Sequence, residues 1–120
     1  MVKIYVAGLY SRNSKGKKAN VIEVLENIRA GIFVCNRLLS LGYAVFCPWL
    51  DFQYGLIGIN LTIEQYRANC IAWLEVSDAM LVISGAGLRG GVDDEIIRAR
   101  ELKISTYADE HVLIYEVPPC

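Results

Sequence analysis

The chain has 120 residues, of which 54% are hydrophobic, and its formal net charge is -1 at pH 7. A chain of this length buries one compact core and leaves no room for a second, so we expect a single domain over residues 1–120. The near-neutral charge provides no basic face. This argues against a site for polymeric nucleic acid and still permits a small, locally held anion.

The chain starts with MVKIYVAGLY, which is strand-like and lacks the basic, long apolar and small-residue segments of a signal peptide. No apolar run approaches the roughly 20 residues of a membrane span. We therefore expect a cytoplasmic protein that makes no membrane contact.

The four cysteines are dispersed without a CxxC pair, and His111 is the single histidine, so the spacing of metal ligands is absent. We expect neither a metal nor another cofactor. Cys35, Cys47 and Cys70 have the character of small buried hydrophobic residues, and Cys120 that of a tail residue.

The chain opens with a predicted strand over residues 2–9, a continuous apolar run typical of a strand buried on both faces. After a ten-residue loop, YSRNSKGKKA, Asn20 and Glu23 have the spacing of a capping box and predict the start of a helix that Gly42 closes. The apolar residues of this helix recur every three or four positions, at Val21, Leu25, Ile28, Ile32, Cys35 and Leu39.

A second buried strand is predicted over residues 43–48, and the aromatic, glycine-rich stretch 49–60 that follows has no clear period. Because structureless stretches of this length are uncommon unless they are functional, we expect a binding loop or lid here. Thr62 and Gln65 then have the capping-box spacing of a second helix. Its predicted apolar face carries Ile63, Cys70 and Leu74.

The C-terminal part predicts a third strand, a third helix, a short fourth strand and a fifth strand, over residues 79–85, 92–103, 104–108 and 112–117. Strands that alternate with helices form βαβ crossovers, which require parallel strands with helices on both faces. The expected fold is therefore α/β: a small, doubly wound, mainly parallel five-stranded sheet of flavodoxin-like or Rossmann-like type. Its binding crevice should lie at the carboxyl ends of the strands. Asp78, which precedes the third strand, falls at the opposite edge and is interpreted as a turn residue.

The stretch GLRGGVDDEI, residues 87–96, packs three glycines, one arginine and three acids into the turn and helix start after the third strand. Glycines there let the backbone approach a ligand, and the free N–H groups of a helix start favour anions. Glu95 falls in the first helical turn, where the helix dipole favours the carboxylate anion by roughly 0.3–1 kcal/mol, which suits a nucleophile. The same energetics also explains Asp93, Asp94 and Glu95 as ordinary helix-start acids.

Four stretches resemble the nucleoside 2-deoxyribosyltransferase superfamily: KIYVAGLYS, the aromatic loop after FCPW, CIAWLEVSDAMLVISG, and the glycine turn followed by VDDEIIRARELKI. That superfamily includes 2′-deoxynucleoside 5′-phosphate N-hydrolases and small uncharacterised, often phage-associated relatives. The resemblance covers nearly the whole chain in order. It implies that Glu95 attacks C1′ of a deoxyribose and forms a covalent glycosyl-enzyme. Water as the acceptor then gives a hydrolase, and a nucleobase gives a transferase.

The resemblance also implies that Gly8, Tyr10 and Ser11 line the site, with Tyr10 hydrogen-bonded to the nucleophile, whereas Tyr5 and Tyr43 are expected in the core. Trp49, Phe52 and Tyr54 either stack on a base or pack as a lid or a subunit interface. The cationic loop with Arg12, Lys15, Lys17 and Lys18 either holds a 5′-phosphate or is simply solvated. The remaining expected substrate-binding residues are Asp51, Ser84, Gly87, Arg89, Gly90 and Gly91.

Two positions depart from the family pattern. Arg89 stands where many phosphate-dependent members have a serine, so phosphate binding stays open. Asn69 and Cys70 occupy the stretch where active members place an aspartate that assists at the base. The general acid is then Asp93, Asp94, Asp51 or a group from another subunit.

Three classes of function remain open. The first is N-glycosidic cleavage or deoxyribosyl transfer on a nucleoside or its 5′-monophosphate. The second is a catalytically silent nucleotide-binding module of the same fold. The third is a lysine-decarboxylase-like nucleotide phosphoribohydrolase, whose turn resembles GGVDDE but whose Gly-Thr pair is missing here. For any of them we expect a homodimer or larger homo-oligomer, because an apolar loop is seldom left in water.

Overall fold

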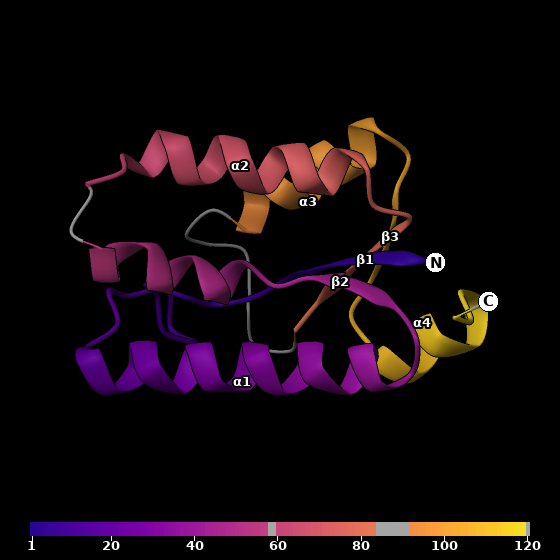
Figure 1. Cartoon of the computed structure of the whole chain (residues 1–120), viewed down its shortest axis with the longest axis horizontal. Helices are drawn as coiled ribbons and strands as arrows, with labels where there is room; N and C mark the ends of the chain where they lie inside the picture. The colour runs from indigo at the N-terminus through magenta and orange to yellow at the C-terminus, as the bar shows by residue number, and fades with distance from the viewer. Residues whose placement is uncertain (58–59, 84–91, 120) are drawn as a thin grey trace.

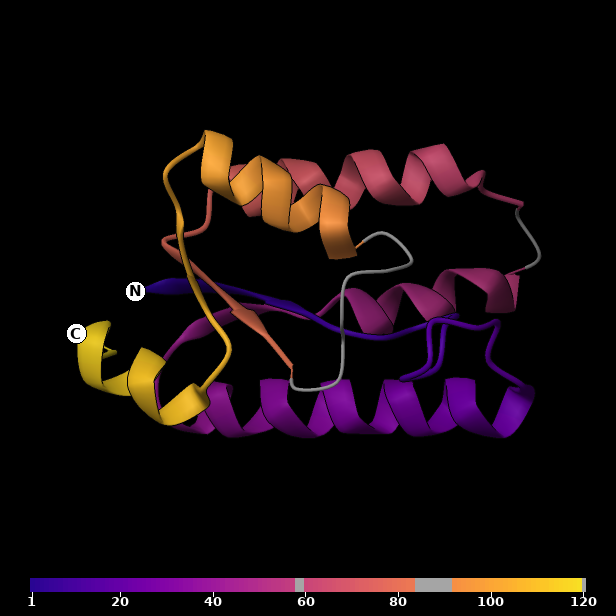
Figure 2. The same ribbon diagram turned by 180° about the vertical axis from the view of Figure 1, so that it is seen from behind.

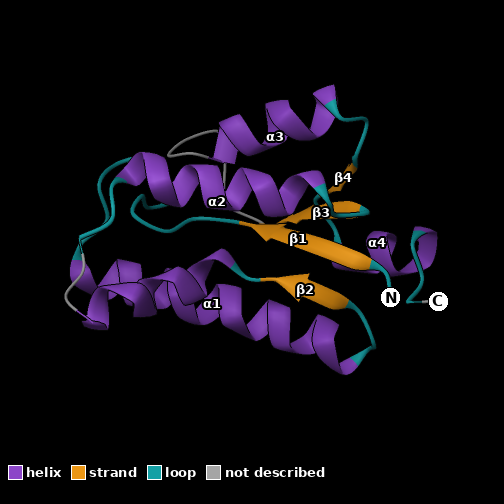
Figure 3. Cartoon of the chain, turned by 45° about the horizontal axis from the view of Figure 1, so that its top comes forward, coloured by secondary structure: helices purple, strands orange, loops and turns teal. Residues whose placement is uncertain are grey.

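The computed structural model describes residues 1–57, 60–83 and 92–119 of the chain. Within them, four strands form one parallel sheet in the order β2-β1-β3-β4 (Figure 3). The strands are β1 (Lys3–Ala7), β2 (Ala44–Phe46), β3 (Ala79–Val82) and β4 (Ser105–Tyr107). They confirm four of the predicted strands and their parallel pairing.

Helices cover both faces of this sheet (Figures 1 and 2). On one face lie α1 (Val21–Ser40) and α4 (Glu110–Glu116), and on the other lie α2 (Ile63–Glu75) and α3 (Val92–Glu101). This α/β arrangement is compatible with a Rossmann-like fold. Among the described residues, no helix is both long enough and apolar enough to cross a membrane.

The predicted fifth strand, residues 112–117, is wrong, because this segment belongs to helix α4. Asp109 caps the helix, and its Oδ1 accepts hydrogen bonds from the backbone N–H groups of His111 and Val112. Leu113 is fully buried while Tyr115 is 87% exposed. The apolar run therefore has one buried side with helical spacing, which a short β-branched sequence conceals.

The predicted structureless loop after β2 is also wrong for most of its length. Residues Pro48–Ile57 form a 3-10 helix, η1. Trp49 anchors it: the side chain is 2% exposed and its Nε1 donates to the backbone oxygen of Leu9 at 2.8 Å. The start of η1 is therefore part of the hydrophobic core rather than a free lid.

Both predicted capping boxes are present. Asn20 and Glu23 exchange side chain to backbone hydrogen bonds at the start of α1, and Thr62 and Gln65 do so at the start of α2. At the end of α1, Gly42 has a φ of +101°, which is a backbone conformation that favours glycine. These local signals set the helix boundaries where the sequence places them.

The buried face of α1 differs from the predicted one. Gly31, Cys35 and Leu38 face the core, because the indole of Trp49 packs directly on Gly31 and a Cβ there would overlap the ring. This contact sets the rotation of the helix about its axis. Several residues of the predicted apolar face are therefore exposed: Val21, Leu25, Ile32 and Leu39.

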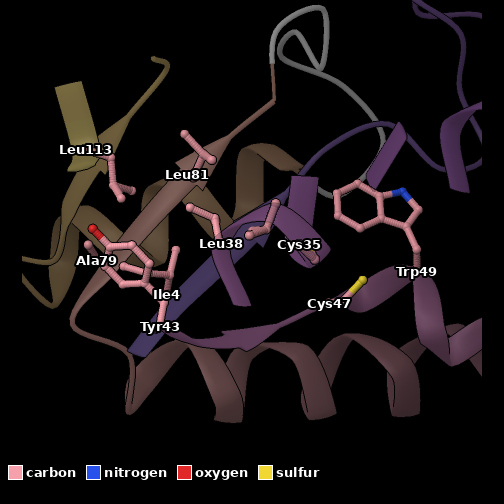
Figure 4. Close-up of a cluster of buried hydrophobic side chains, with 10 residues drawn as sticks. Ile4, Cys35, Leu38, Tyr43, Cys47, Trp49, Ala79, Leu81 and Leu113 are labelled. Carbon is pink, nitrogen blue, oxygen red and sulfur yellow. The ribbon is translucent and has the colours of Figure 1, made fainter. Parts of the chain in front are cut away.

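The core is divided into two clusters by the sheet, and β1 contributes to both. Ile4 and Val6 belong to the cluster on the α1 side, whereas Tyr5 and Ala7 belong to the cluster with α2 and α3. Figure 4 shows the first cluster, which extends from Trp49 and Cys47 at one end to Tyr43 and Leu113 at the other. The central strand is buried on both faces, as its sequence predicts.

Asp78 lies at the amino-terminal edge of the sheet, opposite the strand ends where the crevice is predicted. Its Oδ2 accepts the backbone N–H of Lys3 at 2.7 Å, and its own N–H donates to the oxygen of Lys3 at 2.8 Å. This confirms the structural role expected for it.

Candidate functional site

A cleft of about 570 Å³ lies at the carboxyl ends of the strands, where the fold prediction places the binding crevice. It is bounded by the segments that follow β1 and β2, by one face of α2 and by the start of α3. Its described lining is Ala7, Gly8, Tyr10, Ser11, Arg12, Pro48, Trp49, Asp51, Ile63, Tyr66, Arg67, Cys70, Ile71, Asp94 and Glu95. A more open hollow of about 760 Å³ along the outer face of α1 has no carboxylate among its described lining residues.

Glu95 lines the cleft, and the buried Tyr5 supports it from the core. The Tyr5 hydroxyl donates to Glu95 Oε1 at 2.7 Å, although the two residues are 90 positions apart. The Tyr5 ring is held by a stack on Phe46, with centroids 5.2 Å apart, and Phe46 in turn stacks on Trp73 at 5.7 Å. The aromatic stack and the strand backbone therefore fix the hydroxyl, and the hydroxyl orients the carboxylate.

The pKa of Glu95 is raised to about 7, chiefly because burial disfavours its charged form. The neighbouring charge of Asp94 raises it further, while the hydrogen bond from Tyr5 lowers it. The helix dipole was expected to favour the anionic form of Glu95. The effect of burial on the pKa is larger than that of the dipole, so Glu95 changes between its protonated and ionised forms near neutral pH.

This raised pKa makes the stability of the fold depend on pH. The pKa of Glu95 is about 7 in the folded chain against an ordinary value of 4.5, so its proton stabilises the fold below pH 4.5 and that stabilisation is lost as the pH rises through 7. Replacing Glu95 with glutamine removes the ionisation. The free energy of unfolding of the variant should rise relative to that of wild type, by up to about 3 kcal/mol, as the pH increases from acidic values to about 8. Denaturant unfolding of both proteins across this range checks it, and parallel stability curves would contradict it.

Asp51 and Cys70 lie beside this pair. The Cys70 thiol donates to Asp51 Oδ2 at 3.7 Å and also neighbours the Tyr5 hydroxyl. Burial raises the pKa of Cys70 to about 12 and also raises the pKa of Asp51. The thiol therefore stays protonated as a donor, and the cleft contains a second carboxyl group that takes up a proton more readily than an exposed aspartate.

The loop after β1 brings Tyr10, Ser11 and Arg12 to the cleft. Asn27 of α1 holds it, because its Nδ2 donates to the backbone oxygens of Tyr10 and Arg12, each at 3.0 Å. An antiparallel bridge between Arg12 and Lys18 closes the loop into a small hairpin. Of its four cations, Arg12 lines the cleft, whereas the exposed Lys15, Lys17 and Lys18 do not.

The cleft brings together eight of the residues expected from the sequence, namely Gly8, Tyr10, Ser11, Arg12, Trp49, Asp51, Asp94 and Glu95. The expected partner of the nucleophile is corrected, since Tyr5 rather than Tyr10 supplies the hydrogen bond to Glu95. Tyr5 is also a core residue, as expected, with 0% exposure. The predicted residues Ser84, Gly87, Arg89, Gly90 and Gly91 lie outside the described residues.

The expected roles of Trp49 and Gly8 also change. Trp49 is buried and cannot serve as a free stacking platform for a base, although its ring forms part of the cleft wall. A Cβ on Gly8 would meet Trp49 Cζ2 at 2.7 Å. The packing of the indole therefore requires glycine at this position, independently of any ligand.

The sequence prediction missed Tyr66 and Arg67, which reach the cleft from α2. A signal for them was available. They are three and four residues after Ile63 and precede Cys70, which is the spacing of the predicted apolar face. Extending that spacing to polar residues would have placed both in the cleft.

Comparisons of this chain with protein-family models, with curated proteins and with solved structures found no match. The relation to the nucleoside 2-deoxyribosyltransferase superfamily therefore stays a prediction from the sequence.

Proposed function

We propose that this protein cleaves or transfers the N-glycosidic bond of a nucleoside or its 5′-monophosphate, with Glu95 as the nucleophile. The observation that carries this proposal is the Glu95 carboxyl group in the cleft, held through Oε1 by the Tyr5 hydroxyl at 2.7 Å. A fixed carboxylate facing a cavity is the group that retaining glycoside chemistry requires. The sequence resemblance assigns the same residue to the same role.

The arrangement of the pair suits attack on a sugar. Tyr5 binds Oε1 of Glu95, and no hydrogen bond from another described residue reaches Oε2, which is the oxygen we propose for the attack on C1′. The pKa of the Tyr5 hydroxyl is raised, first by burial and then by the charge of Glu95, so it remains a neutral donor. With a pKa of about 7, Glu95 retains a substantial ionised fraction at neutral pH. Attack by this carboxylate gives a glycosyl-enzyme, which water or a second base then resolves.

The substrate we propose is a nucleoside or its 5′-monophosphate, and two cationic side chains of the cleft are available to bind a 5′-phosphate. Arg12 and Arg67 approach from different elements, and neither is ion-paired with a described carboxylate. Guanidinium groups bind phosphate through paired hydrogen bonds. The rings of Tyr10 and Tyr66 are available to contact the base or the sugar. A doubly wound Rossmann-like fold, which we infer from the parallel sheet, binds nucleotides at this same edge.

The experiment that tests this function is base release measured by chromatography. Wild-type protein is incubated with a panel of 2′-deoxynucleosides, their 5′-monophosphates and the matching ribonucleotides, each with and without a free acceptor base. We expect release from at least one deoxyribose substrate, and exchange of the base would indicate a transferase. Turnover of ribonucleotides alone would favour the phosphoribohydrolase alternative. No release from any substrate would refute catalysis.

A second candidate is a nucleotide-binding module without catalysis. The observation that favours it is Cys70, which lines the cleft from the α2 stretch where active members of the resembled family have an aspartate. Such a module would raise its melting temperature with a nucleotide from the panel and release no base. The same panel therefore separates the two functions.

We further propose that the protein acts as a homodimer or larger homo-oligomer. Large apolar side chains remain exposed over η1 and α1, where the sequence predicted a buried or covered surface. They include Leu50, Tyr54, Leu56, Ile57, Val21, Leu25, Phe33 and Leu39. Soluble proteins seldom leave apolar surfaces of this kind uncovered.

A further inference from the structure

We propose that Asp51 donates the proton to the departing base, with Cys70 as the residue that positions its carboxyl group. This inference rests on the proposed glycosidic function and names the group that the sequence left unassigned. It follows from the contact between the Cys70 thiol and Asp51 Oδ2 at 3.7 Å, inside the same cleft as Glu95.

Asn69 and Cys70 of α2 occupy the stretch where active members of the resembled family have an aspartate, and neither side chain is a carboxylic acid. Of these two residues, Cys70 lines the cleft, and its thiol cannot replace a carboxylic acid as a proton donor to a base at neutral pH. However, the Cys70 side chain contacts a carboxyl group from another element, because Asp51 extends toward it from η1. A carboxyl group is therefore present at this wall of the cleft, although it comes from a different part of the chain.

The position of Asp51 is built into the core. Trp49, two residues earlier, is buried and donates through Nε1 to the oxygen of Leu9 at 2.8 Å. This anchor holds the first turn of η1 against the loop that follows β1. Asp51 therefore projects from a fixed backbone. Its side chain is half-buried, and its Oδ2 accepts a hydrogen bond from the Cys70 thiol.

Asp94 is the third described carboxyl group on the cleft wall, after Asp51 and Glu95, and it is less suited to donate a proton to the base. Its side chain is exposed to water, whereas that of Asp51 is half-buried in the wall of the cleft. It is also adjacent to Glu95 in sequence on the same helical turn. Asp51 faces the cleft from a different element, which allows one carboxyl group to act on the sugar and the other on the base.

The protons and electron pairs balance over two steps. In the first, Glu95 forms a bond to C1′, the bond from C1′ to the base nitrogen breaks with its electron pair on the base, and Asp51 gives the base its proton. In the second, water attacks C1′, Asp51 takes a proton from that water, and the bond from Glu95 to C1′ breaks. The sum is base plus free sugar from nucleoside plus water, and both carboxyl groups return to their starting state.

The test compares two leaving groups in the wild type and in Asp51→Asn. The first substrate is the nucleoside or nucleotide whose base wild-type protein releases in the panel. The second is the same sugar with an activated base, an N7-methylated purine or a 5-fluorinated pyrimidine, which leaves with little or no proton transfer. We expect Asp51→Asn to lose about 100-fold to 10,000-fold on the first substrate and less than about tenfold on the second. Glu64→Gln, an exposed carboxyl removed outside the cleft, serves as the matched control and should behave as wild type on both.

Three further variants separate positioning from folding. Asp51→Glu retains the acid and should recover part of the lost rate if Asp51→Asn is poorly folded. Cys70→Ala should lose less of the rate of base release than Asp51→Asn does, with the same dependence on the leaving group. Cys70→Ser, which restores a hydrogen-bond donor, should recover the rate that Cys70→Ala loses. An equal loss on both substrates, or no loss at all in Asp51→Asn, would overturn the assignment while the proposed function stands. Absence of base release by the wild type would remove both.

Discussion

The Glu95→Gln protein is expected to lose base release by at least about a thousandfold on any substrate that the wild type cleaves. Glutamine has nearly the same shape as glutamate, and its side-chain oxygen can still accept the hydrogen bond that Tyr5 donates to Glu95 Oε1. What the variant lacks is the negative oxygen that attacks C1′. Initial rates of base release, measured at one pH above 7 where wild-type Glu95 is largely ionised, give the comparison.

The control for this loss is Glu101→Gln, which removes an exposed carboxylate from the last turn of the same helix. It should release base at the wild-type rate. The Glu95→Gln protein should also unfold at a higher denaturant concentration than wild type at that pH, because it no longer places an ionised group in a buried site. An inactive variant that is also less stable would mean that the loss reflects misfolding rather than chemistry.

Gly31→Ala is expected to destabilise the fold by roughly 3 kcal/mol, at the upper end of the usual cost of overpacking a core. The added methyl group would overlap the indole of Trp49, which is 2% exposed and is held by the hydrogen bond that its Nε1 donates to the backbone oxygen of Leu9. Neither the ring nor the middle of a 20-residue helix moves without disturbing the core. For a domain of this size the melting temperature should fall by more than about 10 °C.

A double-mutant cycle tests whether the indole is the cause. Trp49→Phe removes one ring of the side chain, so it should cost less stability in the Gly31→Ala background than in the wild type. Asn36→Ala, at an exposed position of the same helix, is the control for adding alanine to α1 and should lie within about 0.5 kcal/mol of wild type. Strictly additive effects would show that Gly31 and Trp49 do not conflict.

The features that the sequence predicted correctly are those set by local chemistry. Asn20 with Glu23 and Thr62 with Gln65 specify helix starts by hydrogen bonds within four residues, and both capping boxes are present. The continuous apolar run around Ile4 specifies a strand buried on both faces. Parallel strands then follow from the alternation of strands and helices, and the cleft follows from the strand ends.

The features that were missed depend on packing between distant segments. The contact between Trp49 and Gly31 sets the rotation of α1 about its axis, so that part of its apolar face is exposed. Hydrophobic periodicity alone does not predict a contact between segments this far apart in the sequence. The sequence predicts a strand where helix α4 lies, because the short apolar run fits the period of a strand as well as that of a helix. Asp109 is an N-cap signal that favours the helix.

The identity of the tyrosine beside Glu95 was missed for a similar reason. The pleat of β1 directs Tyr5 to the side of α2 and α3, and strand order then brings it to the start of α3. A resemblance based on short motifs pointed to Tyr10 instead. Because a buried tyrosine hydroxyl needs a partner, the interior position of Tyr5 was itself a clue to a polar neighbour.

The step that defines the proposed reaction is the formation of a covalent bond between Glu95 and C1′ of the substrate sugar. The most direct measurement is mass spectrometry of the acid-quenched protein after reaction with a substrate that carries a fluorine at C2′, which slows breakdown of the intermediate. The expected result is one added sugar on the peptide that contains Glu95, with the base released in equal amount and no addition in Glu95→Gln. Release of base with no sugar on that peptide would contradict a covalent role for Glu95.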